Sequence, residues 1–222
     1  MKPLLIACDF DGTITRRDTL HVIVEAFGTE GVWEALEPRL RAGEITVEQA
    51  MQEQFAAVRA TPEQVRDLVL AEAGIREGFA EFAAWARAEG HRLIVFSSGF
   101  RTVIDLMLGQ AGVEGLEVLS HEAEFSADGC RLVWSDRGER CERCDRHCKR
   151  HDLVPRRRGE PLVYLGDGIS DRCPALLADL LFARDGLARW LDDEGVPYVG
   201  FEDFHTVRRE IERRAPRLAA AA

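Results

Sequence analysis

Two carboxylates separated by a single residue stand near the start of the chain. Asp9 and Asp11 directly follow an apolar stretch, Leu4–Cys8. Side chains two residues apart in an extended chain point the same way, and two like charges held close together are unfavourable unless a cation or a shared proton relieves them. Mg²⁺ binds carboxylate oxygens together with substrate phosphate, and Asp167 offers a third carboxylate after another apolar run. The sequence therefore predicts a Mg²⁺ site formed by Asp9, Asp11 and Asp167.

Lysine is rare in this chain, since Lys2 and Lys149 are the two lysines among 29 basic residues. A single interior lysine in a chain that otherwise uses arginine suggests a specific role, because its compact ammonium acts as a point charge. Asp171, one helical turn after Asp167, is placed to orient Lys149 or to hydrogen-bond a metal-bound water. The alternative for Lys149 is an ordinary solvated surface lysine, and the alternative for each aspartate is a strand end or a helix cap.

Strand ends must bring these groups together. Short apolar runs, typical of buried parallel strands, occur at Leu4–Cys8, Arg92–Phe96, Pro161–Leu165 and Leu180–Ala183. The first three end at Asp9, at Ser97 and at Gly166-Asp167-Gly168. Helical periodicity separates the runs, which predicts an α/β fold with a doubly wound parallel sheet. The carboxyl ends of such strands form the usual ligand crevice, so we expect these residues to converge.

The first two strands are unusually far apart in the sequence. From Asp9 to Ser97 there are 88 residues, whereas a strand–helix–strand unit takes about 30. Apolar residues recur at helical spacing within this surplus, and Thr61-Pro62 combines a capping hydroxyl with a proline, which is typical of a helix start. We therefore predict a helical cap over residues 15–73, inserted into a catalytic core formed by residues 1–14 and 74–222.

The charge balance excludes some classes of function. Lys and Arg number 29 against 39 Asp and Glu, a net charge of −10, so general binding to nucleic acid or to an anionic membrane is not expected. No apolar run approaches the ~20 residues that cross a bilayer, and the apolar stretch before Asp9 is too short for a secretory signal. We expect a cytoplasmic monomer or homodimer that acts on a small molecule.

Taken in order, the motifs resemble those of the haloacid dehalogenase-like phosphohydrolase superfamily. They are Asp9-Phe10-Asp11-Gly12-Thr13, Ser97-Ser98-Gly99, Lys149 and Gly166-Asp167-Gly168-Ile169-Ser170-Asp171. The resemblance implies a Rossmann-like core, Mg²⁺ dependence and an aspartyl-phosphate intermediate. It also implies that the helical insertion is a type-1 cap.

The resemblance further implies a role for each matching residue. Asp9 is the expected nucleophile on phosphorus, and Asp11 is the expected general acid and base. Mg²⁺ is expected between the Asp9 carboxylate, the Asp11 backbone carbonyl and Asp167. Four residues are expected to bind the phosphoryl group: Ser97, Ser98, Gly99 and Lys149. The alternative for Ser97-Ser98-Gly99 is an ordinary strand-to-helix turn.

The extended motif from Asp9 to Asp18 resembles one branch of this superfamily, which contains the phosphoserine, phosphoethanolamine/phosphocholine and methionine-salvage phosphatases. The cysteine-rich stretch before Lys149 and the segment Phe182-Ala183-Arg184-Asp185 most resemble the methionine-salvage group, which acts on 2-hydroxy-3-keto-5-methylthiopentenyl-1-phosphate. Hydrolysis of such a metabolite, or of a phosphoserine-like one, is the expected reaction, and phosphotransfer to an alcohol is the alternative.

Three polar residues at the junction of cap and core are candidate determinants of specificity. Arg16, Arg17 and Asp18 are predicted either to contact the leaving group or only to cap the first cap helix.

A cluster of soft metal ligands precedes Lys149. Cys141, Cys144, Cys148 and His151 could complete a tetrahedral zinc site, and the alternative is a loop with reduced thiols. The surrounding run, 137–158, carries nine Arg or Lys against four Asp or Glu. A non-catalytic, zinc-clipped module that binds RNA or an acidic protein is therefore the alternative function, whereas a basic rim that attracts phosphorylated substrate is the simpler interpretation.

Overall fold

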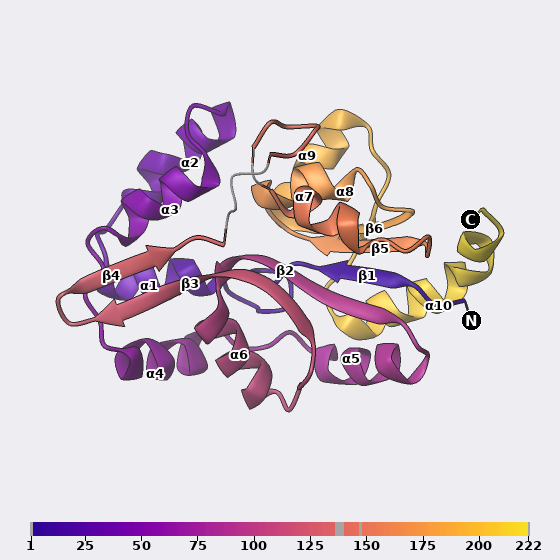
Figure 1. Cartoon of the computed structure of the whole chain (residues 1–222), viewed down its shortest axis with the longest axis horizontal. Helices are drawn as coiled ribbons and strands as arrows, with labels where there is room; N and C mark the ends of the chain where they lie inside the picture. The colour runs from indigo at the N-terminus through magenta and orange to yellow at the C-terminus, as the bar shows by residue number, and fades with distance from the viewer. Residues whose placement is uncertain (1, 136–139, 147, 222) are drawn as a thin grey trace.

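The computed structural model of the chain describes residues 2–135, 140–146 and 148–221, so Arg137 and His147 of the basic, cysteine-rich run lie outside the described residues. Within the described part, seven strands form one sheet in the order β4-β3-β2-β1-β5-β6-β7 (Figure 1). Every neighbouring pair runs parallel except β3 and β4, which form an antiparallel hairpin. The strands are β1 (Leu5–Cys8), β2 (Arg92–Phe100), β3 (Glu117–Ser126), β4 (Gly129–Val133), β5 (Leu162–Gly166), β6 (Leu180–Ala183) and β7 (Val199–Gly200).

Helices cover both faces of the sheet. On one face α5, α6 and α10 pack into the larger hydrophobic cluster, and on the other face α7, α8 and α9 pack into a second cluster (Figure 1). The helices are α1 (Thr19–Phe27), α2 (Val32–Ala42), α3 (Val47–Phe55), α4 (Pro62–Glu72), α5 (Phe79–Ala88), α6 (Arg101–Gln110), α7 (Lys149–Leu153), α8 (Arg172–Ala175), α9 (Asp185–Glu194) and α10 (Phe204–Ala221), with 3₁₀ turns η1 (Val154–Arg156) and η2 (Ile169–Asp171).

Strand β1 lies at the centre of this arrangement. Ile6 and Cys8 belong to the first cluster, while Leu5 and Ala7 belong to the second, so the strand is buried on both faces. This explains its uninterrupted apolar sequence. The chain adds β2 on one side of β1 and β5 on the other, so the ends of these three strands border a crevice. The predicted α/β fold with a doubly wound sheet is confirmed.

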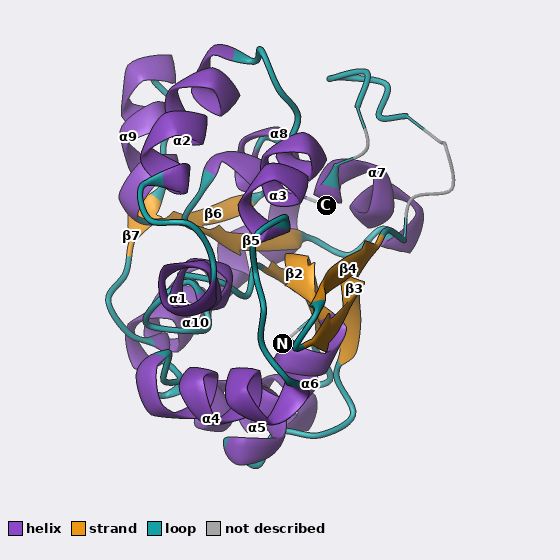
Figure 2. Cartoon of the chain, turned by 90° about the vertical axis from the view of Figure 1, so that its left-hand side faces the viewer, coloured by secondary structure: helices purple, strands orange, loops and turns teal. Residues whose placement is uncertain are grey.

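The inserted helices α1 to α4 lie beyond the carboxyl ends of the strands, and Figure 2 shows α1, α2 and α3 from that end. Thr61 begins α4 as predicted, because its hydroxyl accepts from the Gln64 amide while the Gln64 side chain accepts from the Thr61 amide. The four helices differ in how they pack. Ile23 of α1, Val69 of α4 and the end of α3 belong to the larger cluster on the sheet, whereas α2 and the first turn of α3 form a small cluster around Leu40.

One buried arginine joins the two ends of the insertion. Thr15 forms an isolated β-bridge with Ile75. Arg76 donates from Nη2 to the Gly12 carbonyl (2.7 Å) and the Thr15 carbonyl (3.0 Å), and from Nε to the Thr13 carbonyl (2.8 Å). The guanidinium therefore holds together the loop after β1 and the entry to α5. In the described part of the chain, none of the helices is both long enough and apolar enough to cross a membrane.

Candidate active site

Three aspartates converge where β1 and β5 end. Asp9 follows β1, Asp167 follows β5, and Asp171 closes η2. One carboxylate oxygen from each lies within 4.8 Å of the others. Asp9 is 5% exposed and Asp171 is completely buried, so their charges are shielded from water. The expectation that separate strand ends bring these side chains together is met.

Asp171 is held by four hydrogen bonds. Its Oδ1 accepts from Lys149 Nζ (2.7 Å) and from the hydroxyl of Tyr164 (2.7 Å), and its Oδ2 accepts from the backbone amides of Asp167 (3.1 Å) and Gly168 (3.0 Å). This carboxylate has little capacity left for another ligand. Its position suits the orientation of Lys149, which was one of the two roles considered for it.

Lys149 bridges Asp9 and Asp171. Its Nζ lies 2.5 Å from Asp9 Oδ1, and its side chain is 6% exposed. Burial by itself lowers the pKa of Lys149, but the Asp171 and Asp9 carboxylates outweigh that effect and raise the pKa above its ordinary value. The ammonium is therefore charged at neutral pH, and the alternative of a solvated surface lysine does not fit this placement.

The carboxylates themselves are destabilised as anions. Burial, followed by the neighbouring Asp171 charge, raises the pKa of Asp9 to about 7 despite the opposing effect of Lys149. Burial, followed by the charges of Asp9 and Asp171, raises the pKa of Asp167 well above its ordinary value. A site that holds several acids in a water-poor setting favours either a proton or a cation.

Asp11 faces away from this group and toward the first cap helix. Its Oδ1 accepts from the Thr19 amide (2.9 Å) and the Thr19 hydroxyl (2.5 Å), and its Oδ2 accepts from the Ser97 hydroxyl (3.3 Å). Burial, followed by the Asp18 charge, raises the pKa of Asp11 to about 7. Both protonation states are therefore accessible near neutral pH, as a group that gives and takes a proton requires.

The end of β2 brings the predicted phosphate-binding residues next to Asp11. The Gly99 amide donates to Ser97 Oγ (2.8 Å), and both residues line the same cavity as Ser98. A Cβ on Gly99 would lie 2.6 Å from Asp11 Oδ2, so only glycine lets the strand approach this carboxylate. Gly12 has a φ of 74°, and a Cβ there would overlap the Asp167 carboxylate. Both glycines are therefore required by the packing of the acids.

The donor set fits Mg²⁺. The carboxylates of Asp9 and Asp167 are hard oxygen ligands, and a divalent cation would offset the burial and the neighbouring negative charge that raise their pKa values. The Asp11 side chain is engaged by Thr19 and Ser97, so only its backbone carbonyl remains for a metal, in line with the expectation.

A cavity of about 590 Å³ opens over these groups, between the sheet and the helices α2, α3 and α9. Most residues of its outer wall were not predicted from the sequence. That wall is formed by Trp33, Glu37, Leu40, Arg41, Val47, Met51 and Gln54 from the cap, and by Arg172, Arg189, Trp190 and Asp193 from the opposite side. Nothing in their types or spacing marks them, because a helix face that lines a cavity resembles a helix face that packs on a core.

The three candidate specificity residues separate in the structure. Asp18 lines the cavity and also caps α1, accepting from the His21 amide (3.0 Å). Arg16 donates to the Ile75 carbonyl (3.2 Å), and Arg17 pairs with Glu25 and Glu72. Neither arginine is among the residues that line the cavity. Arg16 therefore links the two ends of the insertion, and Arg17 links α1 to the end of α4 within the insertion.

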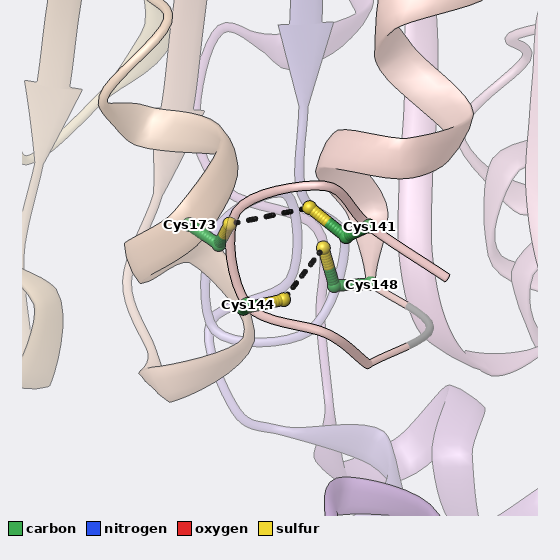
Figure 3. A group of neighbouring side chains, drawn as sticks. All are labelled: Cys141, Cys144, Cys148 and Cys173. Carbon is green, nitrogen blue, oxygen red and sulfur yellow. Dashed lines mark hydrogen bonds between the residues drawn. The ribbon is translucent and has the colours of Figure 1, made fainter.

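The cysteine-rich loop forms a second group of potential ligands behind the site. The sulfurs of Cys141, Cys144, Cys148 and Cys173 all lie within 4.8 Å of one another, and we call them the cysteine cluster (Figure 3). His151 is not in this group, and Cys173 of α8 takes the fourth place instead. The predicted set considered only one segment of the chain, whereas α8 is 25 residues downstream of Cys148 and is brought beside α7 by the fold.

Part of the basic run around this loop is neutralised by other elements. Arg156 pairs with Glu117 (2.8 Å), Arg157 pairs with Asp179 (3.5 Å), and Lys149 is buried. These three residues therefore do not add to a free positive surface that an RNA or an acidic protein could bind.

A doubly wound sheet that brings two aspartates and a serine from its strands next to a buried lysine from a helix defines a class of protein. The profile of the haloacid dehalogenase-like hydrolase family matches residues 6–175, and the chain belongs to this family. The predicted family and the predicted enzyme class, a phosphatase of this family, are confirmed.

Individual proteins of known name are similar to this chain over nearly its whole length. The 2-hydroxy-3-keto-5-methylthiopentenyl-1-phosphate phosphatase of Brevibacillus brevis is 30% identical over 217 residues, which is 96% of each chain. The phosphatase of the same name from Geobacillus thermodenitrificans is 29% identical over 215 residues, which is 96% of this chain and 97% of that one. Among solved structures, a phosphoserine phosphatase that was determined as an analogue of its phospho-aspartyl intermediate superposes on this chain with a TM-score of 0.70. The superposition covers 96% of this chain and 99% of that chain, at 18% sequence identity. At this low identity, the similarity to the phosphoserine phosphatase shows a shared fold.

Proposed function

We propose that this protein is a Mg²⁺-dependent phosphomonoesterase that hydrolyses a small phosphorylated metabolite through a phosphorylated Asp9. The observation that carries the proposal is the convergence of Asp9, Asp11, Asp167 and Lys149 on one cavity in a chain of this hydrolase family. Mg²⁺, bound by the carboxylates of Asp9 and Asp167 and by the Asp11 carbonyl, would supply positive charge opposite the phosphoryl oxygens.

The first half-reaction transfers the phosphoryl group to the protein. A carboxylate oxygen of Asp9 attacks phosphorus, the new O–P bond forms, and the bond from phosphorus to the leaving oxygen breaks. Asp11, in its acid form, donates its proton to that leaving oxygen, so the product departs as an alcohol. Thr19 holds Asp11 Oδ1 through two hydrogen bonds, and Asp11 Oδ2 accepts from the hydroxyl of Ser97, which lines the cavity.

The second half-reaction restores the protein. The Asp11 carboxylate accepts a proton from a water molecule whose oxygen attacks phosphorus, and the Asp9–phosphorus bond breaks. Inorganic phosphate leaves, Asp9 is again a carboxylate, and Asp11 is again an acid. Lys149, fixed by Asp171, keeps its positive charge beside Asp9 and the transferred group in both halves. Ser97 and the amides of Ser98 and Gly99 bind the phosphoryl oxygens.

The helices of the insertion act as the cap of this core. Residues 15–73 form the cap, and residues 1–14 and 74–222 form the catalytic core. Helices α2 and α3 make the roof of the cavity. Helix α2 rests on the small hydrophobic cluster, whereas the end of α3 packs into the larger one. Such a roof opens to admit substrate and closes to exclude water.

The substrate that fits best is 2-hydroxy-3-keto-5-methylthiopentenyl-1-phosphate, the compound in the names of the relatives. Its methylthio chain is apolar, and the cavity offers an apolar wall formed by Trp33, Leu40, Val47, Met51 and Trp190. An apolar wall with a few polar groups at the reacting end is typical of a small-molecule site. Phosphoserine, which is smaller and fully polar, would leave this wall unused.

A panel of phosphomonoesters tests the proposal. Phosphate release would be measured with Mg²⁺ for phosphoserine, phosphocholine, phosphoethanolamine, pyridoxal phosphate and the methylthio-ketopentenyl phosphate. We expect kcat/KM for the last to exceed the others by at least about tenfold, as apolar contacts of this size allow, and we expect EDTA to abolish turnover. Activity in stringently metal-free buffer would contradict the metal assignment. Added alcohols that appear as phosphorylated products would instead favour the phosphotransferase.

A further inference from the structure

The cysteine cluster is outside the chemistry described so far. Cys141, Cys144 and Cys148 come from the segment between β4 and α7, and Cys173 comes from α8 (Figure 3). The Cys144 and Cys148 sulfurs are 3.5 Å apart, and the Cys141 and Cys173 sulfurs are 3.8 Å apart. Two distant pieces of the chain thus present four soft ligands to one point.

The spacing of the sulfurs fits a single tetrahedral ion. Four thiolates at a Zn–S distance of about 2.3 Å lie about 3.8 Å from one another. Cys141-x-x-Cys144 also has the usual spacing of a zinc ligand pair.

The segment that carries three of these cysteines has little secondary structure to hold it in place. The stretch between Val133 and Lys149 holds no regular helix or strand in its described residues, 134–135, 140–146 and 148. A connection of this length without secondary structure is uncommon inside a domain unless it has a function. Cys141 is nonetheless 4% exposed, so the loop folds inward at the cluster, where a metal would replace the missing hydrophobic contacts.

The cluster adjoins the active site through the chain itself. Cys148 directly precedes Lys149, and Cys173 follows Asp171 by two residues. Lys149 and Asp171 form the buried ion pair that places the ammonium beside Asp9. A link between the Cys148 and Cys173 sulfurs would therefore fix the two backbone segments from which this ion pair projects.

We propose that Cys141, Cys144, Cys148 and Cys173 bind one structural Zn²⁺ ion in a tetrathiolate site, and that this ion positions Lys149. The first half of the proposal is independent of the reaction, and the second half rests on the proposed function. Zinc suits the site because four sulfurs in a tetrahedron are its typical structural coordination. His151 has no part in this site.

Metal analysis of the intact protein tests the first half. The wild-type chain, purified in reductant without chelator from zinc-containing medium, should carry about one zinc per chain, as four protein ligands fill one tetrahedral site. The Cys173→Ser and Cys141→Ser variants should lose it. Two controls should retain it: Cys130→Ser, which removes a half-buried thiol of β4 outside the cluster, and His151→Ala, which removes the ligand expected from sequence alone.

A spectroscopic measurement on the wild-type chain does not depend on whether a variant folds. After exchange of the metal for Co²⁺, we expect thiolate-to-cobalt charge-transfer absorption and the intense d–d bands of a tetrahedral cobalt ion. Four results overturn the zinc site: a wild-type protein without zinc, iron in place of zinc, unchanged zinc in Cys173→Ser with loss in His151→Ala, or Cys141–Cys173 and Cys144–Cys148 disulfides in protein kept in reductant.

The kinetics of zinc-free protein test the second half. With Mg²⁺ saturating, Cys173→Ser should lower kcat on a small activated ester about 10-fold to 100-fold, the usual effect of a group that positions another. The ratios of kcat/KM between substrates should not change, because the cap is untouched. Cys173→His should keep both zinc and kcat, since three cysteines and one histidine also bind zinc.

A folded, zinc-free Cys173→Ser chain with the wild-type kcat would overturn the positioning role. Absence of activity in the wild type would refute the proposed function instead and leave the metal analysis intact.

Discussion

The two walls of the cavity are built differently. On the core wall, Asp9, Lys149 and Asp171 are buried and hydrogen-bonded to one another. On the cap wall, Trp33 and Glu37 are half-buried and Arg41 is exposed, and Arg41 pairs with Glu37 on the same helix. The α2 side of the cap wall rests on a small hydrophobic cluster, while the core wall belongs to the centre of the sheet.

This difference separates two requirements of an enzyme. The reacting groups must keep their geometry to within fractions of an ångström, so a dense buried network suits them. The groups that select the substrate must admit it and release it, and the half-buried and exposed side chains that α2 contributes to the cap wall move at a low cost in free energy. Substitutions on the core wall should therefore affect every substrate alike, whereas substitutions on the cap wall should affect substrates unequally.

Removal of the nucleophile should have the largest effect. Asp9→Asn is nearly isosteric but cannot form the acyl phosphate, so we expect kcat to fall by at least about 10⁴-fold on every ester. Trapping of phosphorylated protein with labelled substrate should fail in this variant and succeed in the wild type. Circular dichroism should show a retained fold, and turnover near the wild-type rate would exclude Asp9 as the nucleophile.

Loss of the general acid should divide substrates by their leaving groups. We expect Asp11→Asn to slow alkyl phosphates by roughly 10²-fold to 10⁴-fold, because an alkoxide needs a proton to depart. An aryl phosphate with an acidic phenol needs little protonation and should be spared in the first half-reaction, visible as a burst of phenol. Equal losses on both kinds of ester would place the acid elsewhere.

Removal of the buried ammonium should depress all substrates together. Lys149→Ala takes away a charge opposite the phosphoryl group that every substrate shares, and we expect kcat/KM to fall by about 10²-fold to 10³-fold. Lys2→Ala, the other lysine, is the matched control and should leave kcat/KM unchanged. A loss confined to some substrates would mean that Lys149 contacts the leaving group instead.

Truncation of the cap wall should alter selectivity. Trp33→Ala removes apolar surface from the cavity, and we expect kcat/KM for the methylthio-ketopentenyl phosphate to fall by about 10-fold to 100-fold, with little change for a small activated ester. Arg39→Ala is the control, because Arg39 lies on the same helix but pairs with Glu53 and does not line the cavity. Uniform losses in Trp33→Ala would place specificity on the core.

The smallest predicted effect is the change of kcat with pH near neutrality. The pKa of Asp11 is raised to about 7, and the acid form required for alkyl esters exists below that pKa. In saturating Mg²⁺, the kcat for an alkyl ester should therefore be halved at a pH about equal to this pKa and then decline by about tenfold per pH unit. The initial burst with the activated aryl ester should show no such decline.

The core wall was largely predictable from the sequence, and the cap wall was not. Asp9, Asp167 and Ser97 each end an apolar strand, so residue type and position together indicated a site. Thr19, which donates twice to Asp11, and Arg76, which joins the ends of the insertion, act through contacts that no local pattern encodes. Cys173 was missed for the same reason, because its partners are distant in the sequence and the fold brings them together.

The scarcity of lysine has a practical consequence for measuring motion. A protease specific for lysine finds two cleavage positions in the chain, after Lys2 and after Lys149. The second is buried and bound to two aspartates, so cleavage there requires the active site to open. Where opening is fast relative to cleavage, the cleavage rate reports the population of the open form. The same lysine that balances charge in the closed site thus gives a direct measure of how often that site unfolds locally.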